Sequence, residues 1–553
     1  GVAPVLGPDA SGVGWVFQYV LEDTTHQLDP AQLRALQDFT VRPALQAVTG
    51  VAEIASLGGF ERQYQILLDP DRLTAFGLSI ADITRAVGDA NAEVGARVLE
   101  QAGREFVLRG RGYVRTLADL EASVVSVSAG GNPIRLRDVA TVQFGPDMRR
   151  GAADWNGRGE AVGGIVVMRI GSNALDVVQA VKDEIARLSL PEGVRLVPTY
   201  DRSELILGSI DTLRKTLIEE GVIVAVICLV FLMHAGSAMV AMIVLPLSVL
   251  FSFIAMRYLG LTSNIMSLGG IAIAVGELTD AAIVLIENAH TRLAAAPPGA
   301  DRRRIIIDAC KEVGRPIFFS LLLITVSFLP IFTLAGQAGR LFAPLAYTKT
   351  FAMFAAAVLS ITLAPPLMVW LLRGRFRSEA ENPVNRFLSR LYRPVVRAVV
   401  RWRVAVMVAA FAVMISTVPV MLKLGSEFMP PLDEGSLLVM PTTFPGISIE
   451  EARRALNAQD RIIKSFSEVK SVHGKTGRAE TATDPAQLDM NEIVVTLKPR
   501  DEWPLFATSR WYSSWAPEWL RGALRPLWPE ARPRTQRELV RALDAALKMP
   551  GYQ

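Results

Sequence analysis

Six long apolar runs in the middle of the chain constrain its fold more than any other feature. They lie near residues 216–233, 239–257, 265–288, 316–335, 343–372 and 404–424. A helix needs about 20 apolar residues to cross the hydrocarbon core of a bilayer. One such run would also fit a buried core helix, but six in succession predict a membrane domain over residues 213–424. Only 20% of the 553 residues are charged, against about 25% in soluble domains, which argues against a soluble enzyme.

Arginine and lysine gather in two of the loops between these runs, residues 289–315 and 373–403. The positive-inside rule assigns such loops to the cytoplasm. Six crossings then place the flanking blocks, residues 1–212 and 425–553, on the same non-cytoplasmic side. Within the second basic loop, residues 384–402 have an apolar stripe and predict an amphipathic helix on the cytoplasmic membrane surface.

Both flanking blocks have the mixed pattern of α+β domains. Alternation predicts strands over residues 14–21, 63–69 and 492–498. Periodicity and caps predict helices over residues 33–45, 82–91, 174–188 and 448–465, the first ended or kinked by Pro43. Ser79 and Asp82 fit a loose capping box. Because the chain begins at Gly1 and ends at Gln553 soon after a helical run, we expect a fragment built of tandem halves, cut in the second.

Several functional classes have little support in the composition. There are two cysteines and four dispersed histidines, so neither a disulfide framework nor a cysteine or histidine metal site is expected. The net charge is +4 and no basic block alternates with aromatic residues, which argues against nucleic-acid binding. We find no catalytic Ser/His/Asp arrangement, no HExxH and no phosphate-binding loop. The chain is therefore not expected to be an enzyme.

The third apolar run carries three carboxylates, Glu277, Asp280 and Glu287. At about 100° per residue they fall within an arc of roughly 80° of one helix. Carboxylates inside a span are costly and are functional by default, so we predict a proton relay centred on Asp280. The alternative is a structural ion pair or hydrogen bond between helices, and Glu287 could simply be solvated at the cytoplasmic end. Lys349 is a candidate partner for Asp280, unless it snorkels to the interface.

The segment around these carboxylates, residues 274–288, resembles the fourth-helix signature of heavy-metal efflux pumps of the resistance-nodulation-division (RND) superfamily. Further matches occur at residues 200–203, 264–276, 339–342 and 474–484. The resemblance covers nearly the whole chain and is strongest to copper/silver exporters. It implies a polytopic α-helical membrane protein with α+β periplasmic porter and docking domains, of which this chain is a part.

The resemblance also implies a division of the chain. The expected parts are a porter subdomain in two pieces (1–62 and 148–212), a docking subdomain (63–147), six transmembrane helices (213–424) with the amphipathic helix 384–402, and the start of a second porter half (425–553) with a Trp/Pro-rich insertion (504–534). The six spans resemble helices two to seven of twelve. The helix that supplies partners for the proton-carrying aspartate would lie outside this chain.

The activity implied is that of a metal/proton antiporter, a secondary active transporter in the inner membrane of a Gram-negative bacterium. Family members are homotrimers that work with a periplasmic membrane-fusion adaptor and an outer-membrane channel. Membrane lipid is a further expected partner, and nucleic acid is not. No permanently bound cofactor is expected, since Cu(I) or Ag(I) would be the transported substrate.

Metal class depends on the ligands, and thioethers suit the soft ions Cu(I) and Ag(I). Met440 and Met490 resemble the first two of three methionines that hold the ion in the periplasmic cleft of copper/silver exporters, and the third would lie beyond Gln553. Glu492 would share a strand face with Met490 and add charge to the site. The alternative is that both methionines only pack in a core.

Four other methionines are candidates for a stepwise metal relay: Met148, Met266, Met353 and Met368. The chain departs from the family pattern at Leu278 and Leu285, where copper/silver exporters have methionine. Leucine cannot ligate a metal, so a path from the cytoplasm is in doubt whereas uptake from the periplasm is not. Glu277, where a copper/silver exporter has alanine, and Thr279 are further departures that could change the proton affinity of Asp280.

Competing functions remain open at this point. One is export of divalent zinc, cobalt or nickel, although the methionines and the few histidines count against it. A multidrug pump would need an aromatic-lined cleft, and only 7% of residues are aromatic. A further alternative is a membrane anchor or metal sensor that does not pump, although the presence of Asp280 counts against it. The insertion 504–534, with Trp511, Trp515, Trp519 and Trp528, is either an added contact surface or a helix packed on its own subdomain.

Overall fold

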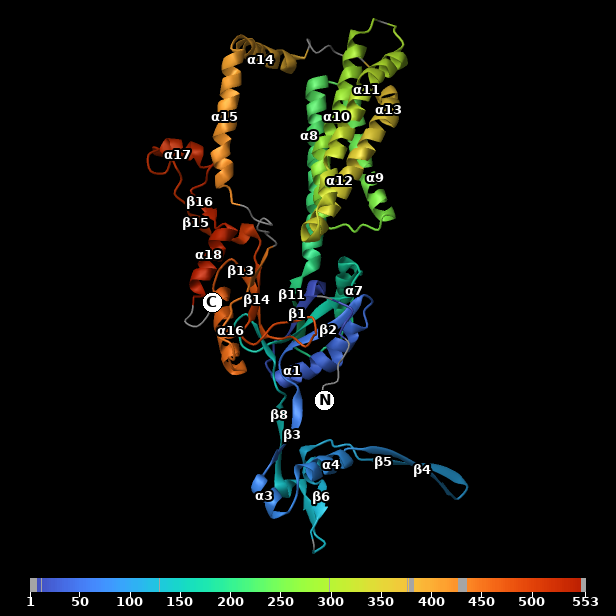
Figure 1. Ribbon diagram of the computed structural model, residues 1–553, viewed down its shortest axis with the longest axis vertical. Coiled ribbons are helices and arrows are strands. Elements are labelled where there is room, and N and C mark those ends of the chain that lie inside the picture. The colour runs from blue at the N-terminus through green and yellow to red at the C-terminus, as the bar shows by residue number, and fades with distance from the viewer. Residues whose placement is uncertain are drawn as a thin grey trace. The chain divides into compact units, whose positions relative to one another are not determined.

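The computed structural model describes residues 7–10, 12–128, 130–297, 299–374, 376, 382–425 and 435–548, with the side chains of 278–282 and a few others left outside the description. The chain divides into two compact units (Figure 1). Unit 1 combines Gly1–Ser203 with Leu432–Gln553, and unit 2 is Glu204–Pro431. The two mixed blocks of the sequence therefore belong to one unit, and the apolar runs to the other.

The first sheet of unit 1 has the order β11-β1-β10-β2, with all neighbours antiparallel. Its strands are β1 (Trp15–Asp23), β2 (Val51–Gly58), β10 (Val162–Met168) and β11 (Val194–Asp201). Apolar side chains of the strands pack on helices α1 (Pro30–Leu36), α2 (Arg42–Gln46) and α7 (Ala174–Arg187). Residues of β1 are buried on both faces, because a second layer covers the side away from these helices.

The predicted helix 33–45 is interrupted. A π-helical turn, Gln37–Val41, separates α1 from α2, and Pro43 lies in the first turn of α2. A proline costs no helical hydrogen bond at that position, so the helix resumes through it instead of ending. The other predicted elements are confirmed within two residues: helices α4 (Ile80–Ala90) and α16 (Ile449–Lys464), α7, and strands β1, β3 (Arg62–Leu68) and β14 (Asn491–Leu497).

A smaller part of unit 1 extends from the pair β3 and β8 (Ala140–Pro146). It holds its own apolar core, which includes Leu73, Ile83 and Leu136. The capping box of Ser79 and Asp82 is present at the start of α4. The remaining elements are α3 (Pro70–Ala75), the hairpin β4 (Glu93–Gln101) and β5 (Arg104–Arg111), α5 (Leu117–Glu121), β6 (Val124–Val127), β7 (Pro133–Arg135) and α6 (Leu136–Val139).

The second sheet of unit 1 has the order β12-β14-β13-β9. Strands β12 (Ser436–Val439), β13 (Val469–Gly477) and β14 come from the last block of the chain, whereas β9 (Gly151–Trp155) comes from the first. Helix α16 packs on β13 and β9, and α18 (Gln536–Ala546) contributes Leu539 and Leu543 to the same core. Sequence reasoning did not predict that one sheet joins the two blocks.

The Trp/Pro-rich insertion forms β15 (Leu505–Ala507), α17 (Glu518–Leu524) and β16 (Ala531–Pro533). The ring of Trp511 contacts those of Tyr512, Trp515 and Trp528. Tyr512 is buried, but Trp511, Trp515 and Trp519 are exposed. Part of the insertion therefore packs on itself, while Trp511, Trp515 and Trp519 leave most of its indole surface exposed.

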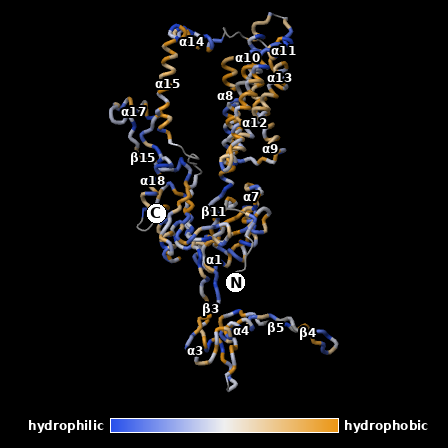
Figure 2. The backbone as a smooth tube through the Cα atoms, viewed as in Figure 1, coloured by the Kyte–Doolittle hydropathy of each residue, from blue (hydrophilic) through white to orange (hydrophobic). Residues whose placement is uncertain are grey.

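Unit 2 is helical, and Figure 2 shows its long apolar stretches. Its helices are α8 (Arg202–Leu232), α9 (Ala235–Tyr258), α10 (Ile265–Ala295), α11 (Arg302–Ser327), α12 (Gly336–Thr362), α13 (Ala364–Leu371), α14 (Pro383–Arg401) and α15 (Arg403–Lys423). Helix α10 packs against α9, α11 and α12 around one large apolar cluster. The predicted amphipathic helix 384–402 corresponds to α14.

Among the described residues, four segments are long and apolar enough to cross a membrane: α9, Arg302–Thr333, α12 and α15. The other two predicted spans correspond to α8 and α10, which have 31 residues each. Both carry ionisable residues, such as Glu219 and Glu220 in α8 and Glu277 in α10. That these two also cross the membrane, and the orientation of all six, stays a prediction.

Candidate functional site

The register of β12 and β14 brings the predicted metal ligands together. Val439 pairs with Ile493, and an isolated bridge between Thr442 and Met490 continues the same register. Met440 is therefore opposite Glu492. Side chains of opposed residues, and of residues two apart along a strand, project from the same face of a sheet. By this register Met440, Met490 and Glu492 belong to one face.

This face borders a cavity of about 430 Å³ inside unit 1. Met440, which is 45% exposed, and Glu492 both line it, whereas Met490 is not part of the lining. The opposite wall is the first sheet, through residues that include Trp15, Gln18, Leu57 and Ile165. The cavity therefore places one thioether and one carboxylate together in a space large enough for an ion and its ligands.

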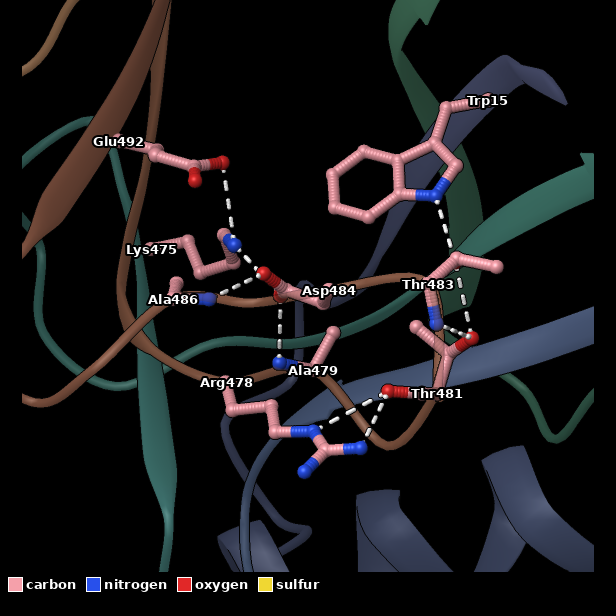
Figure 3. A network of polar contacts seen from close by, with 9 residues as sticks. All are labelled: Trp15, Lys475, Arg478, Ala479, Thr481, Thr483, Asp484, Ala486 and Glu492. Carbon is pink, nitrogen blue, oxygen red and sulfur yellow. Dashed lines mark hydrogen bonds and ion pairs between the residues drawn. The ribbon is translucent and has the colours of Figure 1, made fainter. Parts of the chain in front are cut away.

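A buried ammonium group holds the carboxylate of Glu492 (Figure 3). Lys475 Nζ lies 3.0 Å from Glu492 Oε2 and 2.6 Å from Asp484 Oδ2. It also lies 5.3 Å from the ring centroid of Trp15. Lys475 is only 5% exposed, so these partners replace water around its charge. Glu492, predicted as a carboxylate available to the metal, is therefore paired with a cation.

The loop that follows β13 fixes Asp484 in place. Its carboxylate accepts the backbone N–H groups of Ala479 (2.8 Å) and Ala486 (3.0 Å) as well as the ammonium of Lys475. Such a fully bonded carboxylate is the expected partner for a buried cation. Lys475 and Asp484 were not predicted as site residues. Both lie in the segment 474–484, which carries part of the family resemblance. That resemblance is the only feature of the sequence that could have pointed to them as site residues.

His473 also lines the cavity, beside Lys475 on the same sheet face. Burial, and secondarily the positive charge of Lys475, lower the pKa of His473 to about 4. Its imidazole is therefore neutral near pH 7. Its ring makes an edge contact with Trp155, at a centroid distance of 6.3 Å.

The three predicted carboxylates of the proton relay all lie on α10. The side chain of Asp280 is outside the described residues. Glu277 accepts a hydrogen bond from Lys349 of α12, with 2.7 Å between Nζ and Oε1. Glu277 is the described residue that pairs with Lys349, and the expected pairing of Lys349 with Asp280, whose side chain lies outside the description, stays a prediction. Glu287 lines a separate cavity of about 340 Å³ in unit 2, together with Cys228, Met233 and His290.

The four candidate relay methionines lie in different surroundings. Met353 and Met368 are fully buried in the same apolar cluster of unit 2, which also contains Leu285. Met266 is half-buried in the first turn of α10. Met148 is exposed in unit 1, between β8 and β9. Of these four methionines, Met353 on α12 and Met368 on α13 therefore share one cluster, and the other two lie outside it. Leu278 lies outside the described side chains.

Comparisons with known proteins agree with this architecture. The family model described as AcrB/AcrD/AcrF matches residues 1–510. The chain is 50% identical over 514 residues to "Cation efflux system protein CusA" of Escherichia coli (strain K12), an alignment that covers 91% of this chain and 49% of the relative. It is 48% identical, with the same coverage, to "Putative cation efflux system protein SilA" of Salmonella typhimurium.

More distant relatives include "Cobalt-zinc-cadmium resistance protein CzcA" of Cupriavidus metallidurans, which is 34% identical over 521 residues, 91% of this chain and 48% of the relative. A solved structure, the "X-ray crystal structure of a heavy metal efflux pump, crystal form I", superposes with a TM-score of 0.77 at 29% identity. It covers 100% of this chain and 51% of that chain.

The chain spans about half the length of the curated relatives it matches. Its fold is the RND transporter fold of the solved heavy-metal pump. The family match covers far more than half of the chain, and the relatives of highest listed identity are cation efflux proteins. The chain therefore belongs to the AcrB/AcrD/AcrF family.

Proposed function

We propose that this chain is part of a proton-driven exporter of Cu(I) and Ag(I). The observation that carries the proposal is the shared sheet face of Met440, Met490 and Glu492 beside a cavity. Thioether sulfur is a soft ligand that favours monovalent copper and silver. A carboxylate next to two thioethers supplies the negative charge that they lack.

The ion pair of Glu492 with Lys475 fits this use. When a cation reaches the thioethers, the carboxylate can turn to it, because Lys475 keeps its second partner, Asp484, at 2.6 Å. Release of the cation restores the pair at 3.0 Å. The site would then never leave a buried ammonium without a counter-charge, a state that is costly in a protein interior.

Export of divalent ions is the alternative within the family, and CzcA is a relative at 34% identity. Zinc, cobalt and nickel prefer imidazole, carboxylate and thiolate ligands. No group of three or more His, Cys, Asp or Glu residues suited to a metal occurs within the described part of the chain. The ligand chemistry therefore favours monovalent ions. A non-pumping sensor or anchor would not need Asp280 in a span.

For the proton side of the cycle we propose Asp280 as the carrier, with Glu277 and Glu287 as modulators. Its place on α10, within a bundle of apolar helices, supports this role. Metal would enter from the periplasm, because the cluster around Met353 and Met368 contains Leu285, which cannot ligate. Met148 and Met266 remain candidate relay positions.

The class of the relatives supports a proposal for assembly and location. We propose an inner-membrane protein of a Gram-negative bacterium that acts as a homotrimer. A periplasmic membrane-fusion adaptor and an outer-membrane channel would complete the export path. The four apolar helices support a membrane location.

Metal binding to the purified chain tests the proposed substrate. We expect calorimetric titration to detect Cu(I) and Ag(I) but not Zn(II), because the ligands are thioethers. Met490→Ile removes one sulfur at similar size and should weaken Ag(I) binding by about tenfold or more, equivalent to about 1.4 kcal/mol.

Met168→Ile is the matched control, since Met168 ends β10 and packs against the apolar core of the first sheet, not on the sheet that carries Met440, Met490 and Glu492. Binding of Zn(II) alone would contradict the monovalent assignment. An unchanged affinity in Met490→Ile would mean that this methionine only packs.

A further inference from the structure

Lys349 is a buried ionisable residue in the middle of helix α12 of unit 2. Its side chain is 2% exposed, and its neighbours on α12, among them Ala346, Ala352 and Met353, are fully buried. An ammonium group in such a place must be compensated by charge or by hydrogen bonds. Two groups do this: Glu277 Oε1 at 2.7 Å and the ring of Phe328, with its centroid 3.6 Å away.

The two oxygens of Glu277 have different surroundings. Oε1 accepts the hydrogen bond from Lys349. Oε2 is buried as well, and among the described residues no donor reaches it. A buried carboxylate oxygen without a donor is costly when it is charged. It is also the position at which a proton can be added while the bond from Lys349 to Oε1 is kept.

The pair stands next to the proposed proton carrier. Glu277 precedes Asp280 by three residues along α10, less than one helical turn. Lys349 is the only described residue that forms an ion pair with Glu277. The other charged residues of α9, α11 and α12 are Arg257 in the last turn of α9, Arg340 early in α12, and Arg302, Arg303, Arg304, Asp308, Lys311, Glu312 and Arg315 in α11.

We propose that Glu277 and Lys349 form a second proton-exchange site beside Asp280, an inference that rests on the proposed proton-driven export. A proton from the non-cytoplasmic side bonds to Oε2, and Glu277 becomes neutral while Lys349 stays charged. When that proton leaves toward the cytoplasm, the carboxylate regains its charge and again balances the ammonium. The pair has a net charge of +1 when Glu277 is protonated and 0 when it is not. The membrane potential therefore acts on the protonated form.

Infrared spectroscopy of the purified chain in lipid nanodiscs tests the site without requiring transport. A protonated carboxylic acid has a carbonyl stretching band that the carboxylate lacks. Between about pH 4 and pH 10, the range between free carboxyl and lysine titration, wild type should show a titrating band that Glu277→Gln lacks. Glu312→Gln, on α11 at the basic end of the bundle, is the control and should keep it. Identical spectra for wild type and Glu277→Gln would overturn the proposal.

A second variant tests the pairing. Lys349→Met removes the ammonium, and the pH dependence of the Glu277 band should change by about one pH unit or more, because a contacting charge alters proton affinity on that scale. An unchanged titration would overturn the coupling of the two residues. If Lys349→Met alone does not fold, Lys349→Arg keeps the charge with a different geometry and should still change the titration. The experiment involves no metal, so its failure leaves the metal-binding test of the proposed function unaffected.

Discussion

At the scale of single residues, Lys475 most clearly links stability to the candidate metal site. It is buried between two carboxylates, one of which, Asp484, has a fully buried side chain. Replacing Lys475 with Met would leave Asp484 as an unpaired buried charge. Losing one partner of a buried ion pair costs about 3–5 kcal/mol, and we expect a loss of this order in the thermal unfolding of the purified chain.

The double variant Lys475→Met/Asp484→Asn is the control, because it removes the buried charge together with its partner. It should recover a large part of the lost stability. A single variant as stable as wild type would mean that the pair does not contribute to folding.

His473 gives the site a pH dependence whose direction is set by burial. Its pKa is lowered to about 4 in the folded chain, against about 6.5 when unfolded. Between these values the unfolded chain binds a proton that the folded chain does not, so stability falls as the pH falls from about 6.5 to about 4. The total loss from this residue is about 3 kcal/mol.

His473→Phe keeps a ring of similar size and removes the titration. The difference in unfolding free energy between wild type and His473→Phe should therefore change across this pH range and be constant above it. A difference that does not vary with pH would contradict the buried neutral state of His473.

At the scale of elements, periodicity and caps predicted most helices. Helix α4 has the capping box expected from Ser79 and Asp82. Helix α16 (Ile449–Lys464) agrees with the predicted range 448–465 to within one residue at each end. The prediction of one continuous helix over residues 33–45 was wrong in detail. The π-helical turn between α1 and α2 depends on the tertiary packing of its residues, which the local sequence pattern does not encode. The ion pair of Lys349 with Glu277 was not predicted for a similar reason. Spacing shows which carboxylates share a helix face, but not which of them a lysine side chain on another helix can reach.

Helix α10 carries the prediction on proton coupling. Asp280→Asn keeps the size of the side chain and removes its ability to release a proton. In a transporter that contains this chain, metal export measured in proteoliposomes with an imposed pH gradient should be abolished. Binding of Ag(I) to unit 1 should be unchanged, because α10 belongs to unit 2. Retained export in Asp280→Asn would exclude this residue as the carrier.

At the scale of the whole molecule, the sequence predicted the order of blocks but not how they join. Strand β9, from the first block, pairs with β13, about 300 residues later. Pairing over such a separation depends on the final placement of both segments, and the five-residue β9 has little pattern of its own. The cavity beside Met440 could not be predicted for the same reason, because its walls belong to both blocks.

The turn after β9 is the place where the contact between the first and last blocks of the chain can be tested. Asp154 accepts hydrogen bonds from the N–H groups of Gly157 (2.6 Å) and Gly159 (3.1 Å) and from the side chain of Asn457 on α16 (2.5 Å). Arg461 of α16 donates to the carbonyl oxygen of Gly157 at 2.8 Å. Gly157 has a φ of +68°, and a Cβ there would lie 2.7 Å from the backbone nitrogen of Arg461. Only glycine fits so close to the helix.

Gly157→Ala should therefore loosen the contact between α16 and β9. The left-handed backbone costs a non-glycine residue about 1 kcal/mol, and the clash adds about 1–3 kcal/mol. Gly171→Ala is the matched control, since its φ is +84° but no atom lies within 4 Å of the added Cβ. Amide hydrogen exchange in β9 and β13 should be faster in Gly157→Ala than in Gly171→Ala. Equal exchange in the two variants would mean that the turn does not hold the two blocks together, and that the metal-binding face owes its place to the sheet pairing alone.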